Sequence, residues 1–177
     1  MLVVGANGVG KTNLLEAVHV ATQGFSLRTR TDLQVDAPAD RVLVTCDPHA
    51  LRQVLMNLVL NAQQAMGEGG RVTLTVGADA THGFGTIDVA DTGPGIPQEM
   101  RERLFKPFQT TKSEGHGIGL ALVKRFVDNF GGSVSVDSEA GKGTTFHLKL
   151  PLAENSRAVE TRTVSALVPS PGTPGEG

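Results

Sequence analysis

Residues 85–96 read GTIDVADTGPGI, an apolar stretch that ends in a carboxylate and two closely spaced glycines. The stretch predicts a strand over 85–90. Asp91 then stands at the end of that strand, and Gly93 and Gly95 allow the chain to bend tightly behind it. A carboxylate in this place gives a pocket one acceptor, suited to an exocyclic amine such as that of adenine. The alternative is an ordinary turn that opens with Asp.

Upstream of this stretch, the sequence predicts a helix that runs to about residue 66. Asp47 is a good N-cap and Pro48 suits the first turn, and apolar residues follow at helical spacing. Asn57 and Asn61 are four residues apart, so they share one face at the edge of the apolar stripe. Amide oxygens suit Mg²⁺, which also takes water and phosphate oxygens. The alternative is a pair of solvated amides.

Two further glycine clusters lie downstream. Residues 115–120, GHGIGL, open a predicted helix over 117–130, where backbone N–H groups can point at an anion. Residues 141–146, GKGTTF, precede the last predicted strand, and alone they fit a plain hairpin turn.

The remaining pattern indicates an α+β protein. Further strands are predicted over 41–46, 71–78, 133–137 and 144–150, and a short helix over 97–105. Strands 71–78 and 85–90 are expected to form a hairpin. Because strands and helices segregate, we expect a two-layer α/β sandwich, one mixed sheet with helices on one face.

Composition excludes several classes of function. The 16 basic and 18 acidic residues give a net charge of −2, which disfavours a nucleic-acid clamp or a polybasic membrane surface. Trp and Tyr are absent, which weakens any reading that needs stacking platforms for nucleic acid. The single cysteine, Cys46, allows no intrachain disulfide. With neither a membrane span nor a signal peptide predicted, we expect a cytoplasmic protein.

Taken in order, these motifs resemble the ATP-binding domain of sensor histidine kinases, in the GHKL superfamily shared with gyrase-type and chaperone ATPases. NLVLNAQQA (57–65) is similar to the N box and DTGPGI (91–96) to the first glycine box. RLFKPF (103–108) is similar to the F box, residues 110–132 to the second glycine box and GKGTTF (141–146) to the last. The resemblance implies a Bergerat-type ATP-binding fold over residues 33–151.

The resemblance also implies roles for individual residues. Asn61 would coordinate Mg²⁺, Asn57 would support the phosphate side, and Asp91 would bind the adenine amino group with Thr144 in the same network. Lys112, in a lid over 106–114, would reach the γ-phosphate and is, with Asn57, a candidate catalytic residue. The other implied nucleotide-binding residues are Gly93, Gly95, Ile96, Phe105, Gly115, His116, Gly117, Ile118, Gly119 and Leu120. Phe105 and Phe108 would anchor the lid, or simply pack in the core.

The implied function is transfer of the ATP γ-phosphate to a histidine. Hydrolysing relatives carry a water-activating glutamate where this chain has Asn57, so the amide favours transfer over hydrolysis. The expected partners are a histidine-bearing dimerisation domain and a response regulator in trans, because the one upstream histidine, His19, lacks the acidic residue that usually follows the acceptor. The alternatives are an ATP-binding regulator without transferase activity and an inactive hybrid of two gene fragments.

The N-terminal segment carries a different motif. Residues 5–12, GANGVGKT, match the P-loop pattern between a predicted strand and a helix, and residues 5–29 resemble the start of RecF-type repair ATPases. Two nucleotide-binding folds do not fit in 177 residues. We therefore expect three parts: a P-loop-like remnant over 1–32 whose helix packs on the domain surface, the kinase-like domain over 33–151, and a disordered tail over 152–177.

Overall fold

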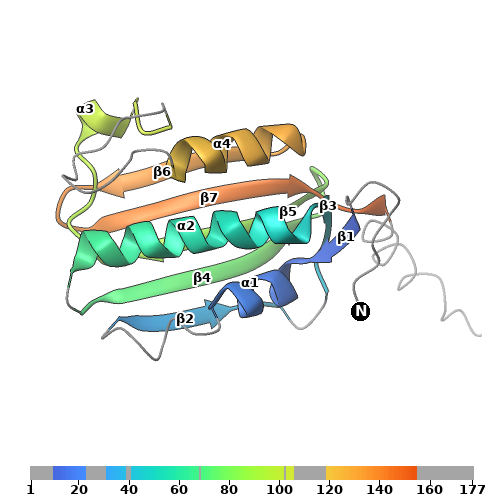
Figure 1. Ribbon diagram of the computed structural model, residues 1–177, viewed down its shortest axis with the longest axis horizontal. Coiled ribbons are helices and arrows are strands. Elements are labelled where there is room, and N and C mark those ends of the chain that lie inside the picture. Colours follow the sequence, from blue (N-terminus) through green and yellow to red (C-terminus); the bar gives the residue numbers. More distant parts are fainter. Residues whose placement is uncertain are drawn as a thin grey trace, which may run out of the picture.

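The computed structural model describes residues 10–22, 31–38, 41–67, 69–101, 103–105 and 119–154. The strands are β1 (Gly10–Asn13), β2 (Asp32–Asp36), β3 (Leu43–Cys46), β4 (Arg71–Asp79), β5 (Phe84–Asp91), β6 (Ser133–Glu139) and β7 (Gly143–Pro151). The helices are α1 (Leu14–Thr22), α2 (Pro48–Met66), α3 (Gln98–Arg101) and α4 (Gly119–Asn129). This succession confirms the α+β class, and Figure 1 shows its arrangement.

A five-stranded mixed sheet organises the molecule. Its order is β2-β4-β5-β7-β6, with β2 parallel to β4 and every other pair antiparallel. The predicted β4–β5 hairpin is confirmed, with Val72 opposite Asp91 and Asp79 opposite Phe84. Helices α1, α2 and α4 lie over one face of the sheet (Figure 1), which confirms the two-layer arrangement.

Alternation along the strands explains why only one face is covered. The fully buried side chains of the sheet, such as Leu74, Ile87 and Leu148, point toward the helices. Most of the alternate positions are polar. On this open face the His147 ring lies 2.8 Å from Asp88 Oδ1 and 3.2 Å from Asp137 Oδ2, joining the three strands β5, β6 and β7.

Local signals set the ends of α2 as predicted. The side chain of Asp47 accepts a hydrogen bond from the His49 N–H at 2.9 Å, and Pro48 is the first helical residue. Gly67 ends the helix with a φ of 70°, and its N–H bonds to the Gln63 carbonyl. The buried stripe of α2 packs against the sheet, which fixes the rotation of the helix and therefore the placement of its polar face.

The start of the chain differs from the P-loop expectation. Lys11 and Thr12 belong to strand β1, which pairs antiparallel with β3, and the helix begins only at Leu14. Thr12 is 2% exposed, and its hydroxyl donates a hydrogen bond to the Cys46 carbonyl oxygen at 3.0 Å. In this arrangement the hydroxyl serves the β1–β3 pair. Residues 5–9 of the motif lie outside the described residues.

Helix α1 lies deeper than the expected surface appendage. Leu14, Val18 and Ala21 are each 0% exposed, and they belong to the same apolar cluster as α2 and the sheet. The predicted helix therefore exists, and it contributes to the main core.

Two other differences concern one helix and one strand. Helix α3 covers four residues of the predicted 97–105, and residues 103–105 form a turn. Strand β2 was not predicted. The predicted tail from residue 155 onward and most of the predicted lid lie outside the described residues. No helix in the described ranges is long and apolar enough to cross a membrane.

Candidate nucleotide-binding site

Asp91 is the buried carboxylate of the site. It ends β5 directly opposite Thr144 of β7, and the two residues are 8% and 5% exposed. The Gly93 N–H donates a hydrogen bond to Asp91 Oδ1 at 2.8 Å, and the Thr144 backbone N–H donates to the same carboxylate. Burial raises the pKa of Asp91 above its ordinary value of 3.8, outweighing the lowering effect of these two donors. A ligand that donates a hydrogen bond to this buried carboxylate would stabilise its charged form.

A hydroxyl pair extends this polar network to the neighbouring strand. The Thr144 hydroxyl lies 3.0 Å from the Ser138 hydroxyl of β6. Ser138 Oγ also accepts a hydrogen bond from the Ile96 N–H at 2.7 Å and lies within 3.0 Å of the Gly143 carbonyl oxygen, to which it donates. Ser138 therefore fixes the glycine loop after Asp91 against the β6–β7 turn. The sequence analysis did not identify it, because a serine in an alternating strand carries no distinctive signal.

Two glycines of the site cannot be replaced without displacing the backbone. Gly95 has a φ of 75°, and a Cβ there would lie 2.2 Å from the Glu139 carbonyl oxygen. Gly143 has a φ of 106°, and a Cβ there would lie 2.0 Å from the Asp91 carbonyl oxygen. Both segments approach so closely because of these glycines, so the first and last glycine motifs act together.

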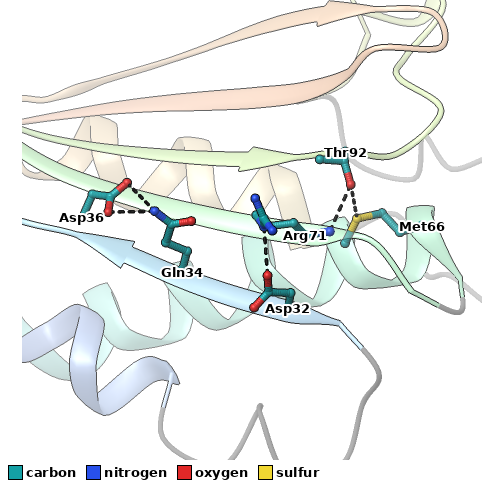
Figure 2. Close-up of polar contacts among 6 residues, drawn as sticks. All are labelled: Asp32, Gln34, Asp36, Met66, Arg71 and Thr92. Atoms are coloured by element: carbon teal, nitrogen blue, oxygen red, sulfur yellow. Dashed lines mark hydrogen bonds and ion pairs between the residues drawn. The ribbon is translucent and has the colours of Figure 1, made fainter.

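Thr92 connects the loop after β5 to the neighbouring strand β4 and to the end of α2. Its hydroxyl accepts a hydrogen bond from the Arg71 N–H at 3.0 Å and donates to Met66 Sδ at 3.5 Å (Figure 2). Arg71 Nε in turn donates to Asp32 Oδ2 of β2 at 2.9 Å, while Gln34 and Asp36 bond to each other along the same strand (Figure 2). The surface ion pair adds little stability, but the hydroxyl connects β5, β4 and the end of α2 next to Asp91.

Asn57 and Asn61 of α2 lie next to Gly119, the first residue of α4. A Cβ on Gly119 would lie 3.9 Å from Asn61 Nδ2 and 4.0 Å from Asn57 Cγ. The Gln53 amide donates to Asn57 Oδ1 at 3.4 Å. Both asparagines are half-buried. The predicted amide pair and the start of the predicted glycine-box helix therefore lie side by side.

The donor set at this position was compared with what Mg²⁺ requires. No group of three or more His, Cys, Asp or Glu side chains suited to a metal occurs among the described residues. Mg²⁺ is commonly held by one or two protein oxygens, with water and substrate phosphates completing the octahedron. The Asn61 amide oxygen fits that mode, in which the nucleotide supplies the charged ligands.

An open pocket of about 350 Å³ lies against the Asp91 end of the sheet. Asp91, Gly143 and Thr144 contribute to its wall, together with Ser138, Lys142 and Arg101. Lys142 is paired with Glu139 at 2.7 Å. The pocket has room for a purine ring next to the buried carboxylate.

The remaining predicted residues divide into two groups. Phe105 packs edge-on against Phe146 of the core, with ring centroids 6.5 Å apart, and Ile96 and Leu120 also pack on the core. This contact agrees with the core-packing alternative for Phe105. The second group lies outside the described residues and comprises Phe108, Lys112, Gly115, His116, Gly117 and Ile118.

The fold and this site define an ATP-binding domain of the histidine kinase, gyrase and chaperone type. The sequence pattern of the family described as "Histidine kinase-, DNA gyrase B-, and HSP90-like ATPase" matches residues 46–154, and the chain belongs to this family.

Within the family, the similarities point to histidine kinases. The chain is 37% identical over 156 residues to the sensor histidine kinase ZraS of Escherichia coli (strain K12), covering 78% of this chain and 33% of ZraS. It is 36% identical over 129 residues to sporulation kinase E of Bacillus subtilis (strain 168), covering 72% of this chain and 17% of that kinase. The chain thus spans a third or less of these relatives' lengths.

Solved structures agree with this assignment. The catalytic domain of the histidine kinase ThkA superposes with a TM-score of 0.73 at 29% identity, covering 81% of this chain and 95% of that domain. Full-length ShkA in complex with AMPPNP superposes with a TM-score of 0.73 at 30% identity, covering 85% of this chain and 32% of ShkA. The described part of the chain is a histidine-kinase-type ATP-binding catalytic domain.

Proposed function

We propose that this chain binds Mg²⁺-ATP and transfers its γ-phosphate to a histidine on a separate dimerisation domain, from which a response regulator takes it. The observations that carry the proposal are the buried Asp91–Thr144 pair and the two asparagines of α2 that lie next to the start of α4. The carboxylate accepts from the adenine amino group, and Asn61 contributes an oxygen to the metal on the phosphate side. Asn57 supports the phosphates, with Lys112 and Gly115, Gly117 and Gly119 around them. We place this activity in the cytoplasm.

Transfer is favoured over hydrolysis by the chemistry of Asn57. A neutral carboxamide cannot accept a proton from an attacking water molecule. Phosphoryl transfer needs mainly alignment and charge neutralisation, which a magnesium ion and backbone donors supply. The catalytic domain can then act on a histidine brought to it by another domain.

The P-loop-like segment has no role in this proposal. Thr12 is committed to the Cys46 carbonyl oxygen, and Lys11 lies in a strand. We treat residues 1–32 as a remnant of the RecF-like type, of which α1 packs in the main core, and we assign nucleotide binding to the Asp91 pocket.

A chimera tests the proposal directly. The chain would replace the corresponding region of ZraS, whose own dimerisation region then supplies the acceptor histidine. We expect phosphate from γ-labelled ATP to appear on that region as an acid-labile, base-stable phosphohistidine, and the same chimera carrying Asp91→Asn to lose the label. Binding of ATP without transfer would favour the regulator alternative, whereas failure to bind ATP or to unfold cooperatively would favour the inactive hybrid.

A further inference from the structure

Arg101 is a charged residue of the nucleotide pocket that the sequence motifs do not explain. It ends the short helix α3 and lines the same pocket as Asp91 and Thr144. Figure 1 places α3 at the end of the sheet where β6 turns into β7. Arg101 therefore contributes to the pocket from α3, whereas Asp91 and Thr144 contribute to it from β5 and β7.

The Nε of Arg101 is buried without a hydrogen-bond partner. It is the one such side-chain nitrogen or oxygen in the described part of the chain. A buried donor without a partner loses its hydrogen bonds to water and forms none in the protein, which costs free energy. Each such group therefore requires an explanation. Nε itself is shielded from solvent, so a ligand acceptor in the pocket that Arg101 lines can provide the missing partner once the guanidinium turns toward it.

No ion pair of Arg101 occurs among the described residues. Two of the three carboxylates that line the pocket have other partners, Glu139 with Lys142 and Asp137 with His147. The pKa of the third, Asp91, is raised by burial, and the groups that lower it are backbone N–H donors rather than a cation. The Asp91 carboxylate and the Arg101 guanidinium thus line one pocket without forming a pair. A ligand with a donor and an acceptor on one rigid edge can satisfy both.

The position of Arg101 favours the base of the nucleotide over its phosphates. The pocket wall includes Asp91 and Thr144, where the adenine amino group is placed by the proposed function. The phosphate-side residues Asn57, Asn61 and Gly119 are not among the described residues that line it. Arg101 is therefore at the end of the site that holds the purine ring.

We propose, on the basis of the proposed function, that Arg101 is a specificity-determining residue for the purine base. Its Nε–H donates a hydrogen bond to a ring nitrogen of the adenine whose amino group is bound by Asp91. Two contacts on one purine edge fix the orientation of the base, because only a ring that presents the donor and the acceptor together completes both. The acceptor that satisfies Nε is then provided by the substrate.

The test compares the full chain with Arg101→Met, which keeps an apolar stem and removes every donor. Arg52→Met is the matched control, since Arg52 is exposed and does not line the pocket. Calorimetric titrations would use adenosine, ADP and Mg²⁺-ATP. We expect Arg101→Met to weaken the binding of all three by the same factor, about tenfold or more, as for loss of a hydrogen bond from a charged donor. Arg52→Met should bind all three as the unmodified chain does.

Each other result has a defined meaning. Unchanged binding of all three ligands by Arg101→Met overturns the inference, and so does a loss confined to ADP and ATP, which would assign Arg101 to the phosphates. An unmodified chain that binds none of the three refutes the proposed function itself. Thermal unfolding without ligand distinguishes a structural role of Arg101 from a binding role. Because Arg101→Met removes an unpaired buried donor, its unfolding temperature should be equal to or higher than that of the unmodified chain. A lower temperature together with unchanged binding would make Arg101 a structural residue.

Discussion

At the scale of single residues, the buried Asp91 carboxylate lowers the stability of the ligand-free domain at neutral pH and provides an acceptor for a bound ligand. Burial disfavours its charged form, so the folded protein keeps the proton at pH values where the unfolded chain has already lost it. By linkage, folding is favoured most below the ordinary pKa of 3.8, and that contribution is lost as the pH rises through the higher pKa of the folded state. At neutral pH the ionised carboxylate is therefore a cost that a bound donor offsets.

This linkage gives a prediction for Asp91→Asn. The difference in unfolding free energy between the unmodified chain and the variant should change between about pH 3 and pH 7, with the unmodified chain relatively more stable at the acidic end. Urea unfolding at several pH values measures it. A difference that stays constant across this range would show that Asp91 titrates as an ordinary exposed carboxylate, and a change of the opposite sign would show that folding lowers its pKa.

At the scale of elements, the β6–β7 turn and the loop after β5 form one structural unit. They meet through the Ser138 hydrogen bonds and through the close approach at Gly143. The Gly141 N–H also bonds to the Pro94 carbonyl oxygen at 2.8 Å. The pocket thus depends on two segments about 50 residues apart in the sequence, at Gly93 and Gly143.

Gly143→Ala should separate these two segments. An alanine there combines an unfavourable φ of 106° with a Cβ 2.0 Å from the Asp91 carbonyl oxygen. Gly141→Ala is the control, because Gly141 also has a positive φ, of 81°, but a Cβ there has nothing within 4 Å. Gly141→Ala should lower the unfolding free energy by about 1–2 kcal/mol. Gly143→Ala should lower it by about 1–3 kcal/mol more because of overpacking, and this variant should also lose ATP binding.

Urea unfolding and ATP titration of both variants would check this. Equal costs for the two variants, with ATP binding retained in both, would mean that the turn and the loop do not depend on each other.

The same elements show what the sequence could and could not predict. Helix α2 was predictable because the Asp47 cap, the helical spacing of its apolar residues and Gly67 all agree. The β4–β5 hairpin was predictable from its alternation. Strand β2 was missed because its five residues, DLQVD, lie at the edge of the sheet and carry a single alternation. Strand β1 was missed because GKTN is a pattern typical of a loop, and its pairing with β3 is a tertiary effect.

The site shows a similar division. Asp91, Thr144 and the asparagine pair could be proposed from the sequence because each stands in a motif with a known order. Ser138, Thr92 and Arg101 were not found, because their roles come from neighbours in space. A serine or arginine in a polar stretch has no periodicity that distinguishes it from a solvated residue.

At the scale of the whole molecule, α1 joins the N-terminal segment to the main core. Leu14 is fully buried in the cluster shared by α2 and the sheet, and the Leu14 N–H bonds to the Val42 carbonyl oxygen at 2.9 Å. We therefore expect Leu14→Ala to destabilise the one cooperative transition of the domain by about 2–5 kcal/mol. Val20→Ala, at a position 40% exposed on the same helix, should cost about 0.5 kcal/mol or less.

Chemical denaturation followed by circular dichroism measures both values. A Leu14→Ala variant that leaves the main transition unchanged would instead make residues 1–32 an independent appendage.

The nucleotide is proposed to bind at the Asp91 pocket and not at the P-loop-like segment. Titration of Mg²⁺-ATP into the unmodified chain, Asp91→Asn and Lys11→Ala tests it most directly. We predict that Asp91→Asn loses most of its affinity while Lys11→Ala binds as the unmodified chain does. Loss of binding in Lys11→Ala, with Asp91→Asn unaffected, would contradict the account and assign the nucleotide to the N-terminal segment.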